Sequence, residues 1–187
     1  MLNNTMKVAL LAAMLLTSAF SSAELIEAKA LLNYDQEVTP SNATPSDSMG
    51  MATITFDTMA LTLDISVDVT GISLADITFP DGGLAFGALG PFHIHNGVAG
   101  VNAGIVVPFS LASYYTETAT GIMISAMGVS FDAVRLEELM NDGLYLNLHT
   151  LDYGSGEIRG QIARVSAPAG LLLILLALPL LRLARRK

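Results

Sequence analysis

The sequence predicts an all-β domain, an antiparallel Greek-key-like β-sandwich with one short helix. The clearest evidence is at residues 61–70, where apolar and polar side chains alternate over ten positions without an exception. This period indicates a strand with one buried and one solvent-facing side. Other short strand-like segments recur along the chain, and turn signals at residues 80–83 and 153–156 separate them. Many short strands with spaced turns favour a sandwich.

The remaining elements follow from the same patterns. Strands are predicted over residues 25–32, 51–56, 61–70, 105–109, 122–127, 144–150 and 157–164. Residues 57–60 are expected to turn the second and third of these into a hairpin. The helix is predicted over residues 131–140, because Phe131, Val134 and Leu139 lie near helical spacing and Gly143 follows them.

Charge and composition exclude several classes of function. Residues 24–164 form the expected domain and hold all 17 acidic residues but only 4 basic ones, which gives a net charge of −13. Such a surface repels phosphate backbones, so no nucleic-acid partner is expected. The chain has no Cys, so disulfides and thiolate metal sites are excluded.

The N-terminus has the pattern of a signal peptide over residues 1–23. Lys7 precedes an apolar run at residues 8–16, and small residues follow up to Ala23. This order of charge, apolar run and small residues is directional, and it predicts export with cleavage after Ala23. The alternative is a buried N-terminal helix.

The C-terminus, residues 165–187, has the pattern of a hydrophobic anchor or sorting segment. Residues 165–181 carry no charge. The length of this run is at the lower limit for a bilayer-spanning segment, which needs roughly 17–25 residues. The Arg/Lys cluster at residues 182–187 is expected to stay on the cytoplasmic side, with the domain outside. The inner membrane is therefore an expected partner, at least transiently.

This segment resembles the PEP-CTERM type of sorting tail. Ser166, Ala167 and Pro168 precede the Leu-rich run and the Arg-rich end, in the place where that family usually has Pro-Glu-Pro. The resemblance implies an exosortase-like processing enzyme. It also implies a location in the periplasm, on the cell surface or in the extracellular matrix of a Gram-negative bacterium. An uncleaved membrane anchor is the alternative.

Three histidines form a candidate metal site. His93 and His95 are two apart in a predicted strand and so share a face. In residues 144–150 the Leu side chains take the core face, which places Asn147 and His149 on the opposite one. A His-x-His pair with a third His offers three neutral imidazoles and one open position, which suits copper or zinc. The alternative is three hydrogen-bonded histidines without a metal.

Polar neighbours of the histidines are expected to support them. Asn147 lies on the same predicted face, and Glu157 and Arg159 alternate with apolar residues in the following strand. We expect Glu157 and Arg159 to form a cross-strand salt bridge or to orient a ligand. The chain has no Gly-x-Ser-x-Gly motif and no phosphate-binding loop, so no catalytic residues are predicted.

Several segments together resemble the CHRD (chordin) domain family over about residues 25–164. These segments are residues 36–40, 92–97, 143–150 and 156–162. The resemblance implies an extracellular β-sandwich that acts as a binding or structural module of the envelope or matrix. A matrix polysaccharide or protein is then the expected partner.

A more distant likeness is to copper-zinc superoxide dismutases, which also carry a His-x-His strand in a β-sandwich. By that likeness His93, His95 and His149 are copper ligands, and the alternative function is a copper-dependent, superoxide dismutase-like oxidoreductase. The chain has no further His, so a complete dismutase site with a zinc ion does not form.

The tail supports a direct prediction. Deletion of residues 170–187 removes the apolar run and the terminal cations, so the domain is expected to move from the membrane fraction to the periplasm or medium. Fractionation of cells that express each form measures this. Unchanged membrane association of the shortened chain would contradict anchoring by the tail.

Overall fold

A computed structural model of the protein describes residues 25–39 and 44–165. The predicted signal peptide with Ala23, and the sorting motif of Ser166, Ala167 and Pro168, lie outside these residues. Within the described part, no helix has the length and apolar character needed to cross a membrane.

The domain is built on one antiparallel ten-stranded sheet, as the sequence predicts. Its strands are β1 (Leu25–Asn33), β2 (Met49–Asp57), β3 (Thr62–Thr70), β4 (Phe92–Asn96), β5 (Ile105–Phe109), β6 (Tyr115–Glu117), β7 (Gly121–Ser130), β8 (Leu144–Leu148), β9 (Ile158–Gln161) and β10 (Ala163–Arg164). Their spatial order is β5-β4-β8-β9-β1-β2-β3-β7-β6, and β10 also pairs with β1.

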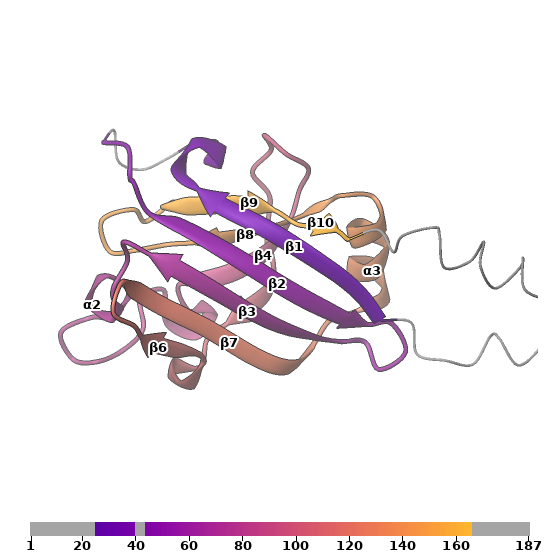
Figure 1. The fold of residues 1–187 in the computed structure, drawn as a ribbon, viewed down its shortest axis with the longest axis horizontal. Helices are drawn as coiled ribbons and strands as arrows, with labels where there is room; N and C mark the ends of the chain where they lie inside the picture. The colour runs from indigo at the N-terminus through magenta and orange to yellow at the C-terminus, as the bar shows by residue number, and fades with distance from the viewer. Residues whose placement is uncertain (1–24, 40–43, 166–187) are drawn as a thin grey trace, which may run out of the picture.

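The sheet curls so that its two halves pack face to face. Figure 1 shows β1, β2, β3 and β7 as a front layer, with β4 and β8 behind it. Apolar side chains from both halves form one core, which includes Ile54 of β2, Val67 of β3, Ile94 of β4 and Leu146 of β8. Burial of this shared apolar surface is the main force that holds the two layers together.

The front layer follows the predicted alternation closely. β1 and β2 pair over nine positions, and β2 and β3 do the same. The turn between β2 and β3 is held by Asp57, whose Oδ1 accepts hydrogen bonds from the backbone N–H groups of Met59 and Ala60 at 2.9 and 2.8 Å. The predicted hairpin at residues 57–60 is thus confirmed.

The described residues contain two α-helices where the sequence predicted one. The expected helix is α3 (Ala133–Met140), with Asp132 as its N-cap. The additional helix is α2 (Leu74–Ile77), a single turn held by a capping box of Ser73 and Asp76. Three short 3-10 helices complete the helical elements: η2 (Tyr34–Gln36), η3 (Gly87–Leu89) and η4 (Ala112–Tyr114).

Two strand predictions differ from the structure in detail. The strand predicted over residues 157–164 is divided at Ile162 into β9, which pairs with β8 and at one position with β1, and β10, which pairs with β1. The edge strand β6 was not predicted, and with three residues it is too short to show a period. The opposite edge is β5, which contains Pro108. The Tyr115 hydroxyl of β6 donates to the Phe109 carbonyl of β5, so the two edges come close together.

The two faces of β2 give a matched stability test. Ile54 is fully buried and Met51 is 63% exposed in the same strand. Ile54→Ala leaves a cavity between the layers and should lower the free energy of unfolding by about 2–5 kcal/mol. Met51→Ala should change it by about 0.5 kcal/mol or less. Urea denaturation measures both, and equal effects would contradict this placement of the core.

Candidate metal centre

Polar side chains form a row across β4, β8 and β9, on the face that points away from the shared core. The strand register sets His93 opposite Asn147 and Asn147 opposite Arg159. Two pairs further along, on the same face, His95 lies opposite Tyr145. Directly opposed residues on one face have Cβ atoms about 4.5–5.5 Å apart, so the row is continuous from the histidines to Arg159.

This polar face is buried, which the sequence did not indicate. All five residues of β8 are buried, and so are His93, His95 and Arg159. The cover is made of loops, whose backbone carbonyls at residues 97–104 and at Gly154 accept hydrogen bonds from the row. The histidines therefore lie in an enclosed polar layer under loops, outside the apolar core.

The three histidines converge. One ring nitrogen of each of His93, His95 and His149 lies within 4.8 Å of the others. The ring centroids are 5.5 Å apart for His93 and His95, 5.0 Å for His93 and His149, and 6.2 Å for His95 and His149. The side chains are 1%, 7% and 8% exposed in sequence order, so solvent does not separate them.

Backbone carbonyls fix two of the rings. His95 Nδ1 lies 2.9 Å from the Ala103 carbonyl oxygen, and His149 Nδ1 lies 3.1 Å from that of Gly154. A carbonyl only accepts, so Nδ1 carries the proton in each ring and Nε2 keeps a lone pair. Within residues 25–39 and 44–165, neither Nε2 atom has a hydrogen-bond partner, and neither nitrogen of His93 has one.

Burial keeps the imidazoles neutral. Burial, together with the neighbouring His149 and His95, lowers the pKa of His93 to about 3, although backbone groups at Gly90 and Leu89 act in the opposite direction. Burial also lowers the pKa of His149 to about 4, and the Gly154 carbonyl opposes this. The pKa of His95 is lowered by burial, against the effect of its bond to Ala103. Neutral imidazole is the form that binds metals.

A buried stack of rings supports His95. The Tyr145 ring lies parallel to that of His95, with 4.8 Å between centroids and 13° between planes. The Arg159 guanidinium carbon lies 3.5 Å from the Tyr145 centroid, in a cation–π contact. Loop oxygens hold the guanidinium, because it donates to the Val98 and Val101 carbonyls and to Asn102 Oδ1 at 3.1, 2.9 and 3.1 Å.

Glu157 takes a different position from the one expected. Its carboxylate accepts hydrogen bonds from the hydroxyls of Ser46, Ser48 and Thr150 at 2.7, 2.9 and 2.6 Å. The ion pairs found in the described residues join Arg135 to Asp132 and Glu138, so the expected salt bridge between Glu157 and Arg159 does not form. The sequence places the two residues in one strand but does not show which loops approach each of them.

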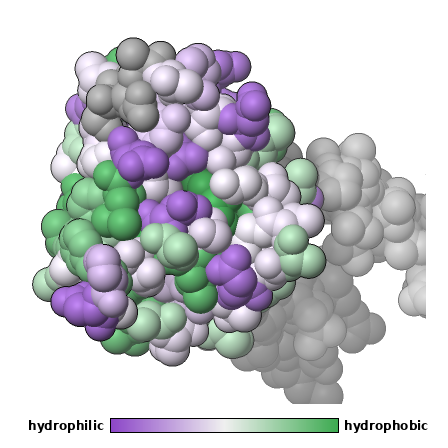
Figure 2. Space-filling model, turned by 90° about the vertical axis from the view of Figure 1, so that its left-hand side faces the viewer, coloured by the Kyte–Doolittle hydropathy of each residue, from purple (hydrophilic) through white to green (hydrophobic). Residues whose placement is uncertain are grey.

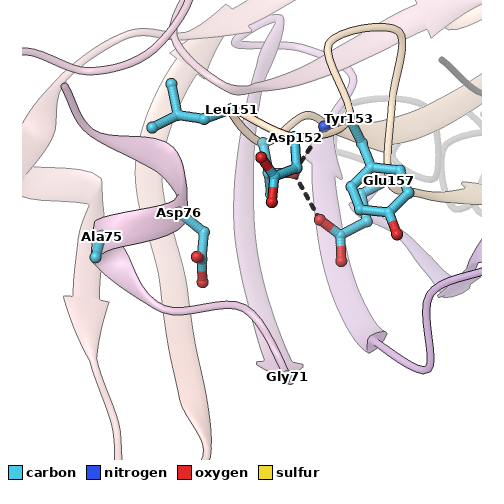
Figure 3. A pocket seen from close by; sticks show the side chains of 8 residues that line it. Gly71, Ala75, Asp76, Leu151, Asp152, Tyr153 and Glu157 are labelled. Carbon is cyan, nitrogen blue, oxygen red and sulfur yellow. Dashed lines mark hydrogen bonds between the residues drawn. The ribbon is translucent and has the colours of Figure 1, made fainter. Parts of the chain in front are cut away.

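Glu157 instead lines a hollow of about 290 Å³ beside α2, together with Asp76, Asp152 and Tyr153. Figure 3 shows the Glu157 carboxylate at one wall of this hollow and Asp76 at another. The hollow lies at the end of the molecule that Figure 2 faces, where hydrophilic residues gather near the centre and apolar residues surround them. A hydrogen bond from Thr150, the residue after His149, links Glu157 to the chain beside the histidines.

Asn147 meets Glu37 at the other side of the row. A Cβ atom built on Gly156 would lie 2.5 Å from Glu37 Oε1 and 2.5 Å from Asn147 Nδ2, so both side chains press against this glycine. Gly156 also has a φ of +124°, which other residues rarely adopt. The glycine thus permits the approach of Glu37 to the polar row.

Of the predicted site residues, the structure brings together the three histidines, with Asn147 beside them and Arg159 in contact through Tyr145. Phe86, Glu37 and Tyr145 lie beside the polar row but were not among the predicted site residues. The Phe86 ring lies 5.0 Å from that of His149 and its backbone is left-handed, with a φ of +64°. Tyr145 had a usable signal, because it lies two residues before Asn147 on the same predicted face.

The lowered histidine pKa values predict acid sensitivity. The unfolded chain binds protons at its imidazoles near pH 6.5, whereas the folded chain does so only near pH 3–4, so stability should fall as the pH decreases from 6.5 to 4. His93→Gln removes one of these imidazoles. The slope of the free energy of unfolding against pH should therefore decrease by the contribution of about one proton. Urea denaturation with a chelator at pH 7.5, 6 and 5 measures it.

The comparison of slopes has an internal control. Glu37 has a raised pKa, so its contribution to stability increases as the pH falls from about 7, which is the opposite sign. It is present in both proteins and cancels in the difference. Identical slopes for the wild type and His93→Gln would contradict a neutral, buried His93.

One known protein family matches most of the chain. The chain matches no curated protein and no solved structure. The family model of the CHRD domain matches residues 28–162, which is more than half of the chain and contains all three histidines. The protein therefore belongs to the CHRD domain family.

Proposed function

We propose that this protein is an exported CHRD-domain module that binds one copper or zinc ion through His93, His95 and His149. One observation carries the proposal: three buried, neutral imidazoles converge, and each has a nitrogen without a hydrogen-bond partner among the described residues.

Unpaired buried nitrogens are costly, and an ion would pair all three at once. A buried polar atom that loses its water and gains no partner costs on the order of 1–3 kcal/mol. His95 and His149 already have the arrangement of metal-binding histidines, with one nitrogen tied to a carbonyl and the other free. Their free Nε2 atoms, with a nitrogen of His93, would be the ligands.

The donor set favours copper or zinc over other ions. Three neutral nitrogens suit these metals, whereas calcium and magnesium require oxygen ligands. The chain has no thiolate to offer. Within the described residues, no carboxylate joins the cluster, so one coordination position would stay open to a small ligand.

Metal titration of the full-length chain tests this proposal. Wild-type protein should bind close to one Cu²⁺ or Zn²⁺ per chain, and His93→Ala and His149→Ala should each lower the affinity by at least about 100-fold, because two ligands hold the ion far less well than three. Met51→Ala, on the outer face of the front layer, is the matched control and should bind like the wild type.

Metal analysis after dialysis and calorimetric titration provide the stoichiometry and the affinity. Metal binding that persists in both histidine variants would contradict the proposed site. Absence of stoichiometric binding in the wild type would do so as well, and would leave a module that acts only through macromolecular contacts.

The open position supports a second candidate, a copper-dependent, superoxide dismutase-like oxidoreductase. Bound copper would supply one-electron chemistry, and the chain would hold the ion and limit access to it through the Phe86 ring beside His149. The copper-loaded samples of the same titration separate the two functions. Redox activity above that of free copper, lost in His95→Ala, favours the enzyme, whereas none favours the binding module.

The setting we propose is the envelope or matrix of a Gram-negative bacterium. CHRD domains occur in extracellular and secreted proteins, which supports export of this chain. The acidic exterior of the domain suits a solvated location outside the cell. A matrix polysaccharide or protein, the inner membrane and an exosortase-like enzyme remain the proposed partners.

A further inference from the structure

Glu37 is a half-buried acid with a buried carboxyl oxygen, and the metal site alone does not explain its surroundings. Its Oε1 atom is buried without a hydrogen-bond partner, and so is Oδ1 of Asn147, as far as the described residues show. Both side chains press on Gly156, with Glu37 Oε1 and Asn147 Oδ1 at 2.5 and 2.6 Å from the position a Cβ atom would take there. The acid and the amide are therefore immediate neighbours.

Asn147 also connects Glu37 to the histidines. It lies directly opposite His93 in the β4–β8 pair, on the same face of the sheet. The row from Glu37 through Asn147 to His93 thus contains three groups in succession, each with an unpaired polar atom. A positive charge placed among the histidines would act along this row on the Glu37 carboxyl.

The groups that face Glu37 compensate its charge only in part. Arg159 is the cation near it, but its guanidinium is held by loop oxygens and by the Tyr145 ring. The other groups around the acid are the exposed Asp35 of η2 and the uncharged Gln36, Asn147 and Gln161. Burial accordingly raises the pKa of Glu37 to about 7, although Arg159 and Asn147 act in the opposite direction.

Glu37 has a route for protons to leave. It lines a cavity of about 280 Å³ with Asp35, Gln36, Arg159 and Gln161. Water in this cavity can accept a proton from the carboxyl without passing the histidines.

We propose that Glu37 is the charge-compensating acid of the histidine site and that binding of a divalent cation there releases its proton. The inference rests on the proposed function. The O–H bond of the carboxyl breaks, its electron pair stays on the carboxylate, and the proton passes to water in the cavity. The net charge added by the ion then falls from +2 to +1.

The neutral histidines make this release visible. In an ordinary three-histidine site, metal displaces protons from imidazoles near pH 6.5. Here burial lowers the pKa of all three histidines, which favours the neutral rings at pH 6. Proton release that the wild type shows and that a Glu37→Gln variant lacks is therefore assigned to Glu37.

The test is calorimetric titration of the full chain with Zn²⁺ at pH 6, in two buffers with different ionisation enthalpies. Wild-type protein should release about one proton per ion. Glu37→Gln, which mimics the neutral carboxyl, should still bind Zn²⁺ but release almost none. At pH 8 it should bind Zn²⁺ roughly tenfold more weakly, because it lacks the carboxylate. Glu27→Gln, the same change at an exposed position of β1, should behave like the wild type.

The outcomes separate the two proposals. Zn²⁺ binding with equal proton release in the wild type and Glu37→Gln overturns the role of Glu37 and leaves the metal site standing. No Zn²⁺ binding by the wild type overturns both. If Glu37→Gln fails to fold, infrared difference spectra of the wild type decide instead: loss of a protonated carboxyl band when Zn²⁺ is added supports the proposal, and an unchanged band overturns it.

Discussion

Both faces of the β4–β8 pair are buried, and much of the domain is arranged to satisfy that constraint. One face carries Ile94 and Leu146 into the core, and the other carries the imidazoles and Arg159. Polar groups without water need partners from the protein. The loops at residues 97–104 and 153–156 supply carbonyl oxygens to His95, His149 and Arg159, so their conformations are tied to the polar row.

The front layer was predictable because its outer face meets solvent. In β2 and β3 each buried residue alternates with a more exposed one, so a period of two is visible in the sequence. In β8 all five residues are buried. The alternation there is between side chains in the apolar core and side chains in the polar row under the loops. The sequence shows the period but not that a loop covers the second face. The short α2 had a local signal, since Ser73 and Asp76 have capping-box spacing.

The histidines were predictable as a set, whereas their surroundings were not. His93 and His95 share a face by the geometry of a strand, and the register with β8 adds His149. Glu37 and Phe86 lie in loops, Glu37 far from the histidines in the sequence, and no periodic pattern extends to either. Glu157 forms no salt bridge with Arg159, because hydroxyls from Ser46 and Ser48, more than 100 residues earlier, donate hydrogen bonds to its carboxylate.

The two edge strands of the sheet affect whether copies of the domain associate when many of them lie close together. An exposed edge strand invites another copy to add its own strand, and this is how β-rich proteins polymerise. Here β6 is only three residues long, and β5 carries Pro108, which has no N–H group to donate. The bond from Tyr115 to Phe109 also draws the edges together. Copies crowded on a surface would therefore remain separate particles rather than join into fibres.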